Sequence, residues 1–138
     1  MRVLVIDDEP DVLMLCRMNL ERAGYDVAEA EDGEAGLWLA RGEPPDVIVL
    51  DVMLPERDGL QILADLAADA GLRRVPVILL TAKTRLQDRV AGWRAGCAEY
   101  ITKPFSPVEL VEAVDRVHRM STSERTDHRR EALARLSA

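Results

Sequence analysis

Short apolar runs alternate along the chain with longer segments in which apolar residues recur at helical spacing. The short runs predict strands near residues 2–7, 25–30, 46–51, 76–81 and 99–102. The longer segments predict helices near residues 10–23, 33–41, 59–70, 85–96 and 106–120. This alternation is typical of βα units that build a parallel sheet. We therefore predict an α/β fold of five βα units, doubly wound around a five-stranded parallel sheet.

The strands differ in their pattern of side chains. Residues 47–50 and 77–80 are apolar without alternation, as expected for central strands covered on both faces. Residues 25–30 alternate between polar and apolar, which predicts an edge strand. The helix at 106–120 begins with Ser106 and Glu109 at capping-box spacing.

The segment from residue 121 to residue 138 has two leucines and many charges, with no density of core-forming residues. Two interpretations fit it: a charged helix capped at Thr126, or a mobile tail. In either case we expect too little apolar area for it to dock on the domain that precedes it.

Charge narrows the range of functions. The 138 residues include 18 basic and 25 acidic side chains, for a net charge of −7. A surface that binds nucleic acid needs a positive field, so we expect no direct nucleic-acid binding by this chain. No apolar stretch approaches the length of a membrane span and no secretory leader is recognisable, so we expect a cytoplasmic protein without membrane contact.

Six further residues are predicted to be structural. Cys16 and Cys97 stand in helical patterns without any metal-binding spacing, which indicates two buried, reduced thiols. Trp38, beside two leucines, is predicted to pack partly into the core. Trp93 follows Leu86 and Val90 at helical spacing and is predicted to be buried. His118 and His128 lie away from the strand ends, where we expect neither catalysis nor metal binding.

Polar residues stand where several predicted strands end. Asp7 and Asp8 end the first apolar run, Asp51 ends the third, and Thr81 ends the fourth. Lys103 follows the fifth. The carboxyl ends of parallel strands lie along one edge of the sheet, where ligands bind. Converging carboxylates repel one another unless a cation lies among them, and a hard divalent ion such as Mg2+ suits oxygen ligands.

These residues occur in a recognisable order. The motifs are Asp7-Asp8, Asp51-Val-Met-Leu-Pro-Glu-Arg-Asp-Gly59, Thr81-Ala82, Tyr100 and Lys103-Pro104-Phe105. In this order, residues 1–120 resemble a response-regulator receiver domain of bacterial two-component signalling, in the CheY-like superfamily. The resemblance implies a flavodoxin-like fold with strand order 2-1-3-4-5. Residues 121–138 would then be a C-terminal tail or a linker that leads into an effector domain.

The resemblance also implies roles for individual residues. Asp51 would be the phosphoacceptor. Asp8 would bind Mg2+ directly and Asp7 through a water, with one oxygen of Asp51 and the backbone carbonyl of Met53 as further ligands; Mn2+ can substitute. Lys103 would bind one phosphoryl oxygen, since a weak carboxylate nucleophile needs a cation there.

Further residues would bind or sense the phosphoryl group. Thr81 and the backbone amide of Ala82 would donate hydrogen bonds to a phosphoryl oxygen. Tyr100 matches a switch position whose ring turns inward when Thr81 moves; the alternative is an edge-strand tyrosine half buried for packing. The Lys103–Pro104 bond is expected to be cis, so that the turn directs the lysine into the pocket.

Two positions are predicted to set the lifetime of the phosphorylated form. Met53 and Lys83 stand two residues after Asp51 and Thr81 and would border the path of the hydrolytic water. A methionine cannot orient water, and a lysine can hold the phosphoryl charge or obstruct the approach. We therefore expect slow self-dephosphorylation. The alternative is that Lys83 points into solvent.

The function that the resemblance implies is a switch rather than an enzyme in the ordinary sense. The chain would take a phosphoryl group from a sensor histidine kinase or a histidine phosphotransfer protein and catalyse only its own phosphorylation and slow dephosphorylation. Its surface at the fourth helix, fifth strand and fifth helix would then change to control a downstream effector. Two alternatives are a pseudo-receiver that works without phosphorylation and a Mg2+-dependent phosphatase with an aspartyl-phosphate intermediate, although the latter needs an aspartate where Met53 stands.

A homodimer that forms on phosphorylation is a further expectation. Arg89 and Glu109 resemble one charged pair of such dimers, in which helices 85–96 and 106–120 and the strand between them take part. Ala98 and Ala113 occupy positions where other charged members would be expected. The pattern therefore supports this dimer only in part.

Overall fold

A computed structural model gives the fold and describes residues 1–137; Ala138 lies outside the described part. The strands are β1 (Arg2–Ile6), β2 (Asp26–Ala30), β3 (Val47–Leu50), β4 (Val77–Thr81) and β5 (Glu99–Thr102). The helices are α1 (Pro10–Arg22), α2 (Gly33–Gly42), α3 (Gly59–Ala68), α4 (Leu86–Arg94), α5 (Pro107–Arg119) and α6 (Thr122–Ser137). All five strands pair in parallel, in the order β2-β1-β3-β4-β5. The predicted fold and strand order are confirmed.

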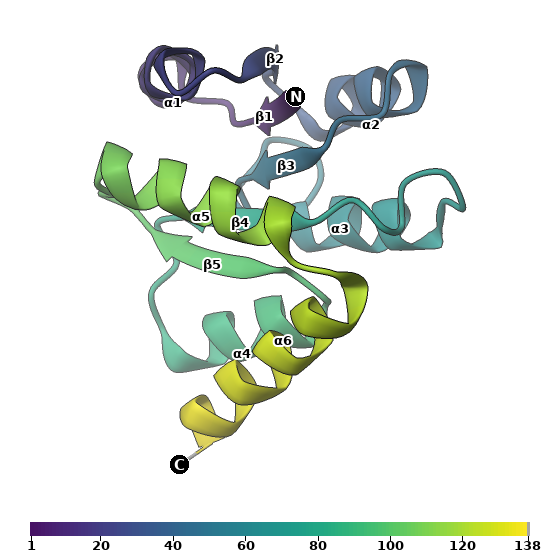
Figure 1. Cartoon of the computed structure of the whole chain (residues 1–138), viewed down its shortest axis with the longest axis vertical. Helices are drawn as coiled ribbons and strands as arrows, with labels where there is room; N and C mark the ends of the chain where they lie inside the picture. Colours follow the sequence, from purple (N-terminus) through teal and green to yellow (C-terminus); the bar gives the residue numbers. More distant parts are fainter. Residues whose placement is uncertain (138) are drawn as a thin grey trace.

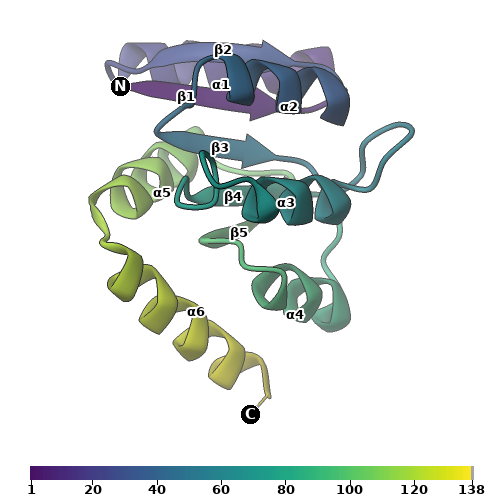
Figure 2. The same cartoon turned by 90° about the vertical axis from the view of Figure 1, so that its right-hand side faces the viewer.

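Helices cover both faces of the sheet (Figures 1 and 2). Apolar residues of α1 and α5 pack with the sheet into one core cluster, and those of α2, α3, α4 and α6 pack into a second on the opposite face. Every residue of β3 and β4 is buried, as expected for central parallel strands. The alternating strand β2 lies at an edge, as its pattern predicted.

The ends of the helices follow from local hydrogen bonding. Ser106 caps α5, since its hydroxyl accepts a hydrogen bond from the Glu109 backbone N–H at 3.5 Å. Asp32 caps α2 by accepting from the Ala35 N–H at 2.8 Å. These side chains satisfy N–H groups that have no partner inside the helix, which explains why the helices begin at these points.

The C-terminal segment forms the helix α6, as one of its two interpretations predicted, but the helix starts at a different residue and docks on the domain. The helix begins at a capping box between Ser121 and Glu124 rather than at Thr126: the Glu124 N–H donates to the Ser121 hydroxyl at 3.1 Å, and the Ser121 N–H donates to the Glu124 carboxylate at 3.0 Å. Ala132 is buried, and Leu133 and Leu136 pack against the core cluster that contains α4. The expectation that this segment has too little apolar area to dock is therefore wrong.

The two tryptophans have different environments. Trp93 is 6% exposed, as predicted, whereas Trp38 is 75% exposed and its predicted core packing is wrong. The buried positions of α2 are Gly33, Gly36, Leu37 and Ala40. Trp38 follows Leu37 and so lies about 100° further around the helix, outside that stripe.

Both cysteines are buried and free, as predicted. Among the described residues, no helix is both long enough and apolar enough to cross a membrane.

Candidate functional site

Two buried carboxylates mark the carboxyl edge of the sheet. Asp7 follows β1 and Asp51 follows β3; they are 1% and 3% exposed. The two strands are neighbours with Ile6 paired to Leu50, so the next residue of each strand lies at the same level. The Asp51 N–H donates to the Ile6 carbonyl at 3.0 Å, which continues the strand pairing into the site.

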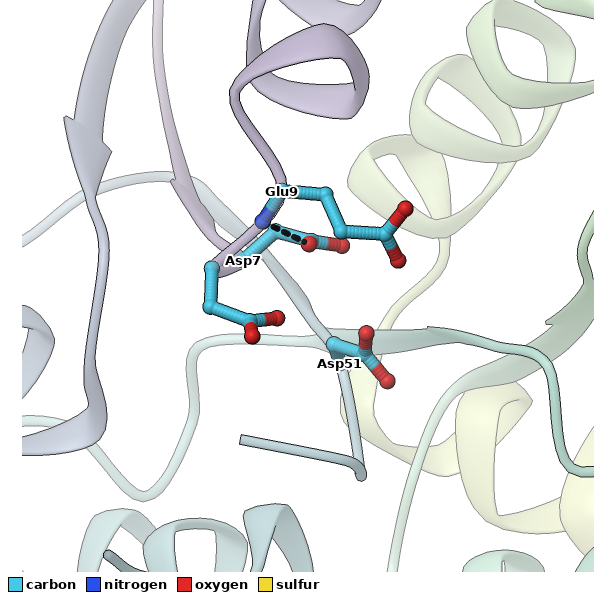
Figure 3. A group of neighbouring side chains, drawn as sticks. Asp7, Glu9 and Asp51 are labelled. Atoms are coloured by element: carbon cyan, nitrogen blue, oxygen red, sulfur yellow. Dashed lines mark hydrogen bonds between the residues drawn. The ribbon is translucent and has the colours of Figure 1, made fainter. Parts of the chain in front are cut away.

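Asp8 and Glu9 complete a group of four carboxylates with Asp7 and Asp51. One oxygen of each lies within 4.8 Å of the others. Figure 3 shows Asp7, Glu9 and Asp51 gathered where β1 and β3 end. The backbone N–H of Glu9 donates to Asp7 Oδ1 at 2.9 Å, which holds the turn between β1 and α1. Asp8 and Glu9 are exposed, so water screens their charges more than those of the buried pair.

Lys103 is the cation of this site. Its Nζ donates to Asp7 Oδ2 at 2.8 Å, to Asp51 Oδ2 at 2.8 Å and to Glu9 Oε1 at 2.9 Å. The Lys103–Pro104 bond is cis, and the Lys103 N–H donates to the Thr81 carbonyl at 2.9 Å. Burial lowers the pKa of Lys103, but the hydrogen bonds to the carboxylates outweigh burial and raise it above its ordinary value. The lysine therefore stays charged.

One ammonium group does not neutralise four carboxylates. Burial raises the pKa of Asp7, and the hydrogen bond from Lys103 offsets this only in part. A pocket of hard oxygen donors with excess negative charge is the donor set that a divalent ion such as Mg2+ prefers. The residues present therefore fit a magnesium site.

The turn after β3 fixes the orientation of Asp51. The Met53 N–H donates to Asp51 Oδ1 at 2.9 Å, and the Gly59 N–H donates to the Val52 carbonyl at 2.8 Å. A Cβ atom at residue 59 would lie 2.2 Å from the Asp51 carbonyl oxygen, so only glycine allows α3 to start this close to β3. The start of α3 thus supports the backbone of Asp51.

Thr81 and Tyr100 lie on the other side of the site, on β4 and β5. The Thr81 side chain is fully buried, and its hydroxyl oxygen accepts a hydrogen bond from the Lys83 N–H at 3.3 Å. The Tyr100 hydroxyl donates to the Lys83 carbonyl at 2.7 Å. Burial raises the pKa of Tyr100 to about 12, so the hydroxyl remains a donor. One residue, Lys83, therefore contacts both predicted switch residues through its backbone.

Two hollows adjoin the carboxylates. One, of about 560 Å³, is lined by Asp8, Met53 and Lys83 among other residues. The other, of about 440 Å³, is lined by Ala82 and Lys103 together with apolar residues that include Phe105. Ala82 is exposed and Met53 is 53% exposed, so both are accessible from solvent.

Comparison with known proteins identifies the family. The profile of the response regulator receiver domain matches residues 3–115, which is most of the chain. The chain belongs to the response regulator receiver family.

The receiver has relatives of two lengths. It is 45% identical over 120 residues to the alkaline phosphatase synthesis transcriptional regulatory protein PhoP of Bacillus subtilis. The aligned region covers 87% of this chain and 49% of PhoP. It is 37% identical over 116 residues to protein PilH of Pseudomonas aeruginosa. Here the aligned region covers 84% of this chain and 96% of PilH. The chain therefore spans about half the length of several curated relatives, such as PhoP, and nearly the whole length of PilH.

Solved receiver structures have the same fold. The chemotaxis response regulator CheY4 of Vibrio cholerae is 29% identical, with a TM-score of 0.80 over 84% of this chain and 97% of CheY4. The receiver domain of a Francisella response regulator is 34% identical, also with a TM-score of 0.80, over 86% of this chain and 96% of that domain.

The receiver brings Asp7, Asp8, Asp51 and Lys103 together, as the strand ends predicted. Glu9 was not among the predicted site residues, although its carboxylate is hydrogen-bonded to Lys103. The signal for Glu9 was the run of three acids that follows β1. Acidic residues are also favoured at the start of a helix, so this run alone assigns Glu9 no role in the site.

Proposed function

We propose that this receiver accepts a phosphoryl group on Asp51 from a histidine of a partner protein and that this changes the surface formed by α4, β5 and α5. The single observation that carries the proposal is the buried Asp51 carboxylate, held beside Asp7 and hydrogen-bonded by Lys103. In the transfer, an Asp51 oxygen forms a bond to phosphorus as the bond from phosphorus to the donor nitrogen breaks. The electron pair of that bond stays on the imidazole.

Asp8, Asp51 and the Met53 carbonyl would bind Mg2+ or Mn2+ directly, and Asp7 would bind it through a water. The bound ion supplies positive charge that neutralises phosphoryl oxygens. The excess of carboxylates over cations at the site supports this assignment.

The remaining roles fall to residues of the chain itself. The Lys103 ammonium, which is now hydrogen-bonded to Asp51, would bind a phosphoryl oxygen, and the Thr81 hydroxyl and the Ala82 amide would donate to another. The Thr81 hydroxyl uses only its oxygen in the contact with Lys83, so its hydrogen remains available. Movement of Thr81 would shift the backbone of Lys83 and so change the hydrogen bond of Tyr100, since both residues contact that backbone.

The phosphoryl donor would be a sensor histidine kinase or a histidine phosphotransfer protein, and we place the receiver in the cytoplasm with it. The effector is proposed from the relatives. Several of them are named as transcriptional regulators and are about twice as long as the matched region. An effector domain or a separate effector protein would therefore bind the changed surface. Phosphorylation would also favour a homodimer.

Phosphorylation by a small-molecule donor tests the assignment of Asp51. Acetyl phosphate with Mg2+ should add one phosphoryl group that hydroxylamine removes, measured by mass spectrometry of the intact protein. Asp51→Asn should abolish the addition, whereas Asp11→Asn, at an exposed position of α1, should not. An acyl phosphate that persists in Asp51→Asn would place the phosphoacceptor elsewhere.

The dependence on metal is tested with beryllofluoride, which mimics a phosphoryl group on aspartate. The DrrB receiver domain, which is 32% identical with a TM-score of 0.77 over 86% of this chain and 97% of DrrB, has been solved in a BeF3-activated form. Beryllofluoride should bind this receiver only when Mg2+ or Mn2+ is present. Equal binding in a metal chelator would refute the magnesium site.

The phosphorylated form should persist for on the order of an hour, because a water is rarely aligned for in-line attack. Met53 and Lys83 line the same hollow beside Asp8, which supports their role in controlling water. The double variant Met53→Asn, Lys83→Glu should shorten the lifetime, measured by loss of labelled phosphoryl group. An unchanged lifetime would remove these two side chains from the explanation.

A further inference from the structure

Helix α4 has little packing of its own. Only Gly92 and Trp93 of its nine residues are buried. The helix packs chiefly against α6 and β5, and Figures 1 and 2 show α6 beside α4 at the same end of the molecule. Much of the packing of α4 is therefore with α6, which lies outside the five βα units.

Specific contacts join the two helices. The Trp93 ring packs edge-to-face on the His128 ring, with centroids 5.5 Å apart and planes at 72°. The Nε2 atom of His128 lies 3.1 Å from the Glu99 carboxylate, so the same residue of α6 also contacts the start of β5. Such aromatic pairs prefer this geometry and stabilise packing beyond the area that they bury.

The first turn of α6 is anchored by Arg125. Its guanidinium donates to the Met120 carbonyl at 2.9 Å and to the Arg74 carbonyl at 2.9 Å. It also donates to the Val117 carbonyl at 3.4 Å. These bonds tie α6 both to the end of α5 and to the segment before β4. Together with the buried Ala132, they show that α6 is held along most of its length.

On its other side, α4 rests on the Tyr100 ring. A Cβ atom at residue 92 would lie 2.8 Å from Tyr100 Cδ2, so glycine allows the ring to lie directly against the helix. The Tyr100 hydroxyl in turn is bonded to the carbonyl of Lys83, in the segment that leads from Thr81 into α4. Helix α4 therefore lies between the predicted switch tyrosine and α6.

We propose that α6 is a regulatory element of this receiver. Its docking on α4 stabilises the arrangement in which the Tyr100 ring lies against Gly92 and the Tyr100 hydroxyl is bonded to the Lys83 carbonyl. In this proposal a phosphoryl group on Asp51 favours the same arrangement, so docking of α6 raises the affinity of the Asp51 site for that group. The proposal rests on the proposed function, in which Thr81 and Tyr100 respond to the phosphoryl group. Two events that favour the same arrangement must favour each other, and typical coupling of this kind changes affinity about 5- to 150-fold.

A matched pair of substitutions tests the coupling. Ala132→Arg places a long charged side chain where α6 is buried, and Ala134→Arg places the same side chain at an exposed position of the same helix. His128→Ala is a milder second variant that removes the contacts with Trp93 and Glu99. Two quantities are measured in the full chain: amide hydrogen exchange of α4 without ligand, and the affinity for beryllofluoride with Mg2+ by calorimetry.

We expect Ala132→Arg to speed amide exchange in α4 and to weaken beryllofluoride binding at least about 5-fold. His128→Ala should give a smaller change in the same direction, and Ala134→Arg should resemble the wild type. Unchanged exchange in α4 would overturn its dependence on α6. Faster exchange with unchanged or tighter beryllofluoride binding would overturn the coupling. If the wild type binds no beryllofluoride at all, the proposed function fails, while amide exchange still decides whether α6 holds α4.

Discussion

Replacement of Lys103 by methionine should reveal how much the fold depends on a single cation. The chain has two lysines, Lys83 and Lys103. The side chain of Lys103 is only 10% exposed and is hydrogen-bonded to Asp7 and Asp51, whose side chains are 2% and 3% exposed. Methionine keeps most of the length of the side chain and removes its charge. The two buried carboxylates then face each other without compensation.

The expected cost follows from burial. Removing one partner of a buried ion pair costs about 3–5 kcal/mol, because a charge is left buried and unpaired. The contact with Glu9 adds little, since the Glu9 side chain is 58% exposed. Asp7, whose pKa is already raised by burial, can take up a proton and relieve part of the cost. We therefore expect the free energy of unfolding to fall by about 3 kcal/mol, out of roughly 5–15 kcal/mol for a typical domain.

Urea denaturation at neutral pH measures this loss, first in a metal chelator and then with Mg2+. The variant should still fold, and an ion that binds the folded state at ten times its dissociation constant should restore about 1.4 kcal/mol. Lys83→Met is the matched control, because Lys83 forms no ion pair within residues 1–137. Equal stability of the two variants in chelator would refute the argument from buried charge.

Two further pairs of substitutions test the packing. Trp93→Ala should lower the free energy of unfolding by about 3–5 kcal/mol, whereas Trp38→Ala, at an exposed position, should change it by less than about 0.5 kcal/mol. Thermal denaturation measures both variants. Equal losses of stability would contradict the finding that Trp93 is buried and Trp38 is not. Gly59→Ala should cost about 1–3 kcal/mol because the new Cβ would lie 2.2 Å from the Asp51 carbonyl oxygen. Gly42→Ala, with no atom within 4 Å of the new Cβ, should not destabilise the helix, and a loss equal to that of Gly59→Ala would show that the close contact is unimportant.

The sequence predicts well which residues meet at the strand ends, because the direction and pairing of the strands determine their positions. Parallel strands place their carboxyl ends on one edge, so Asp7 and Asp51 had to meet there once both were assigned to strand ends. The details of side-chain pairing could not be predicted in this way. That Lys103 contacts Glu9 as well as the two buried aspartates depends on how the turn after β1 is folded.

Apolar residues alone do not predict the docking of α6, because few of them lie on its inward face. In the folded chain its inward stripe consists of Arg125, His128, Arg129, Ala132, Leu133 and Leu136, which recur at helical spacing. Arginine stems and a histidine ring cover apolar surface while their polar groups find partners elsewhere. A search for helical periodicity that includes these amphipathic side chains would have identified the docked face, and the Ser121 and Glu124 capping box would have given its start.

The count of buried charges explains why phosphorylation of Asp51 would require a metal ion. Asp7 carries −1 and Lys103 carries +1, and both side chains are at most 10% exposed. A phosphoryl group on Asp51 replaces a single negative charge with about −2. Without a metal the buried charges would then sum to about −2, and a divalent cation brings the sum to about zero. Asp8 and Glu9, which are exposed, have their charges screened by water and change this balance little. The same balance predicts that a monovalent cation cannot support the phosphorylated state, because one positive charge would remain missing in a site where unpaired charge is costly.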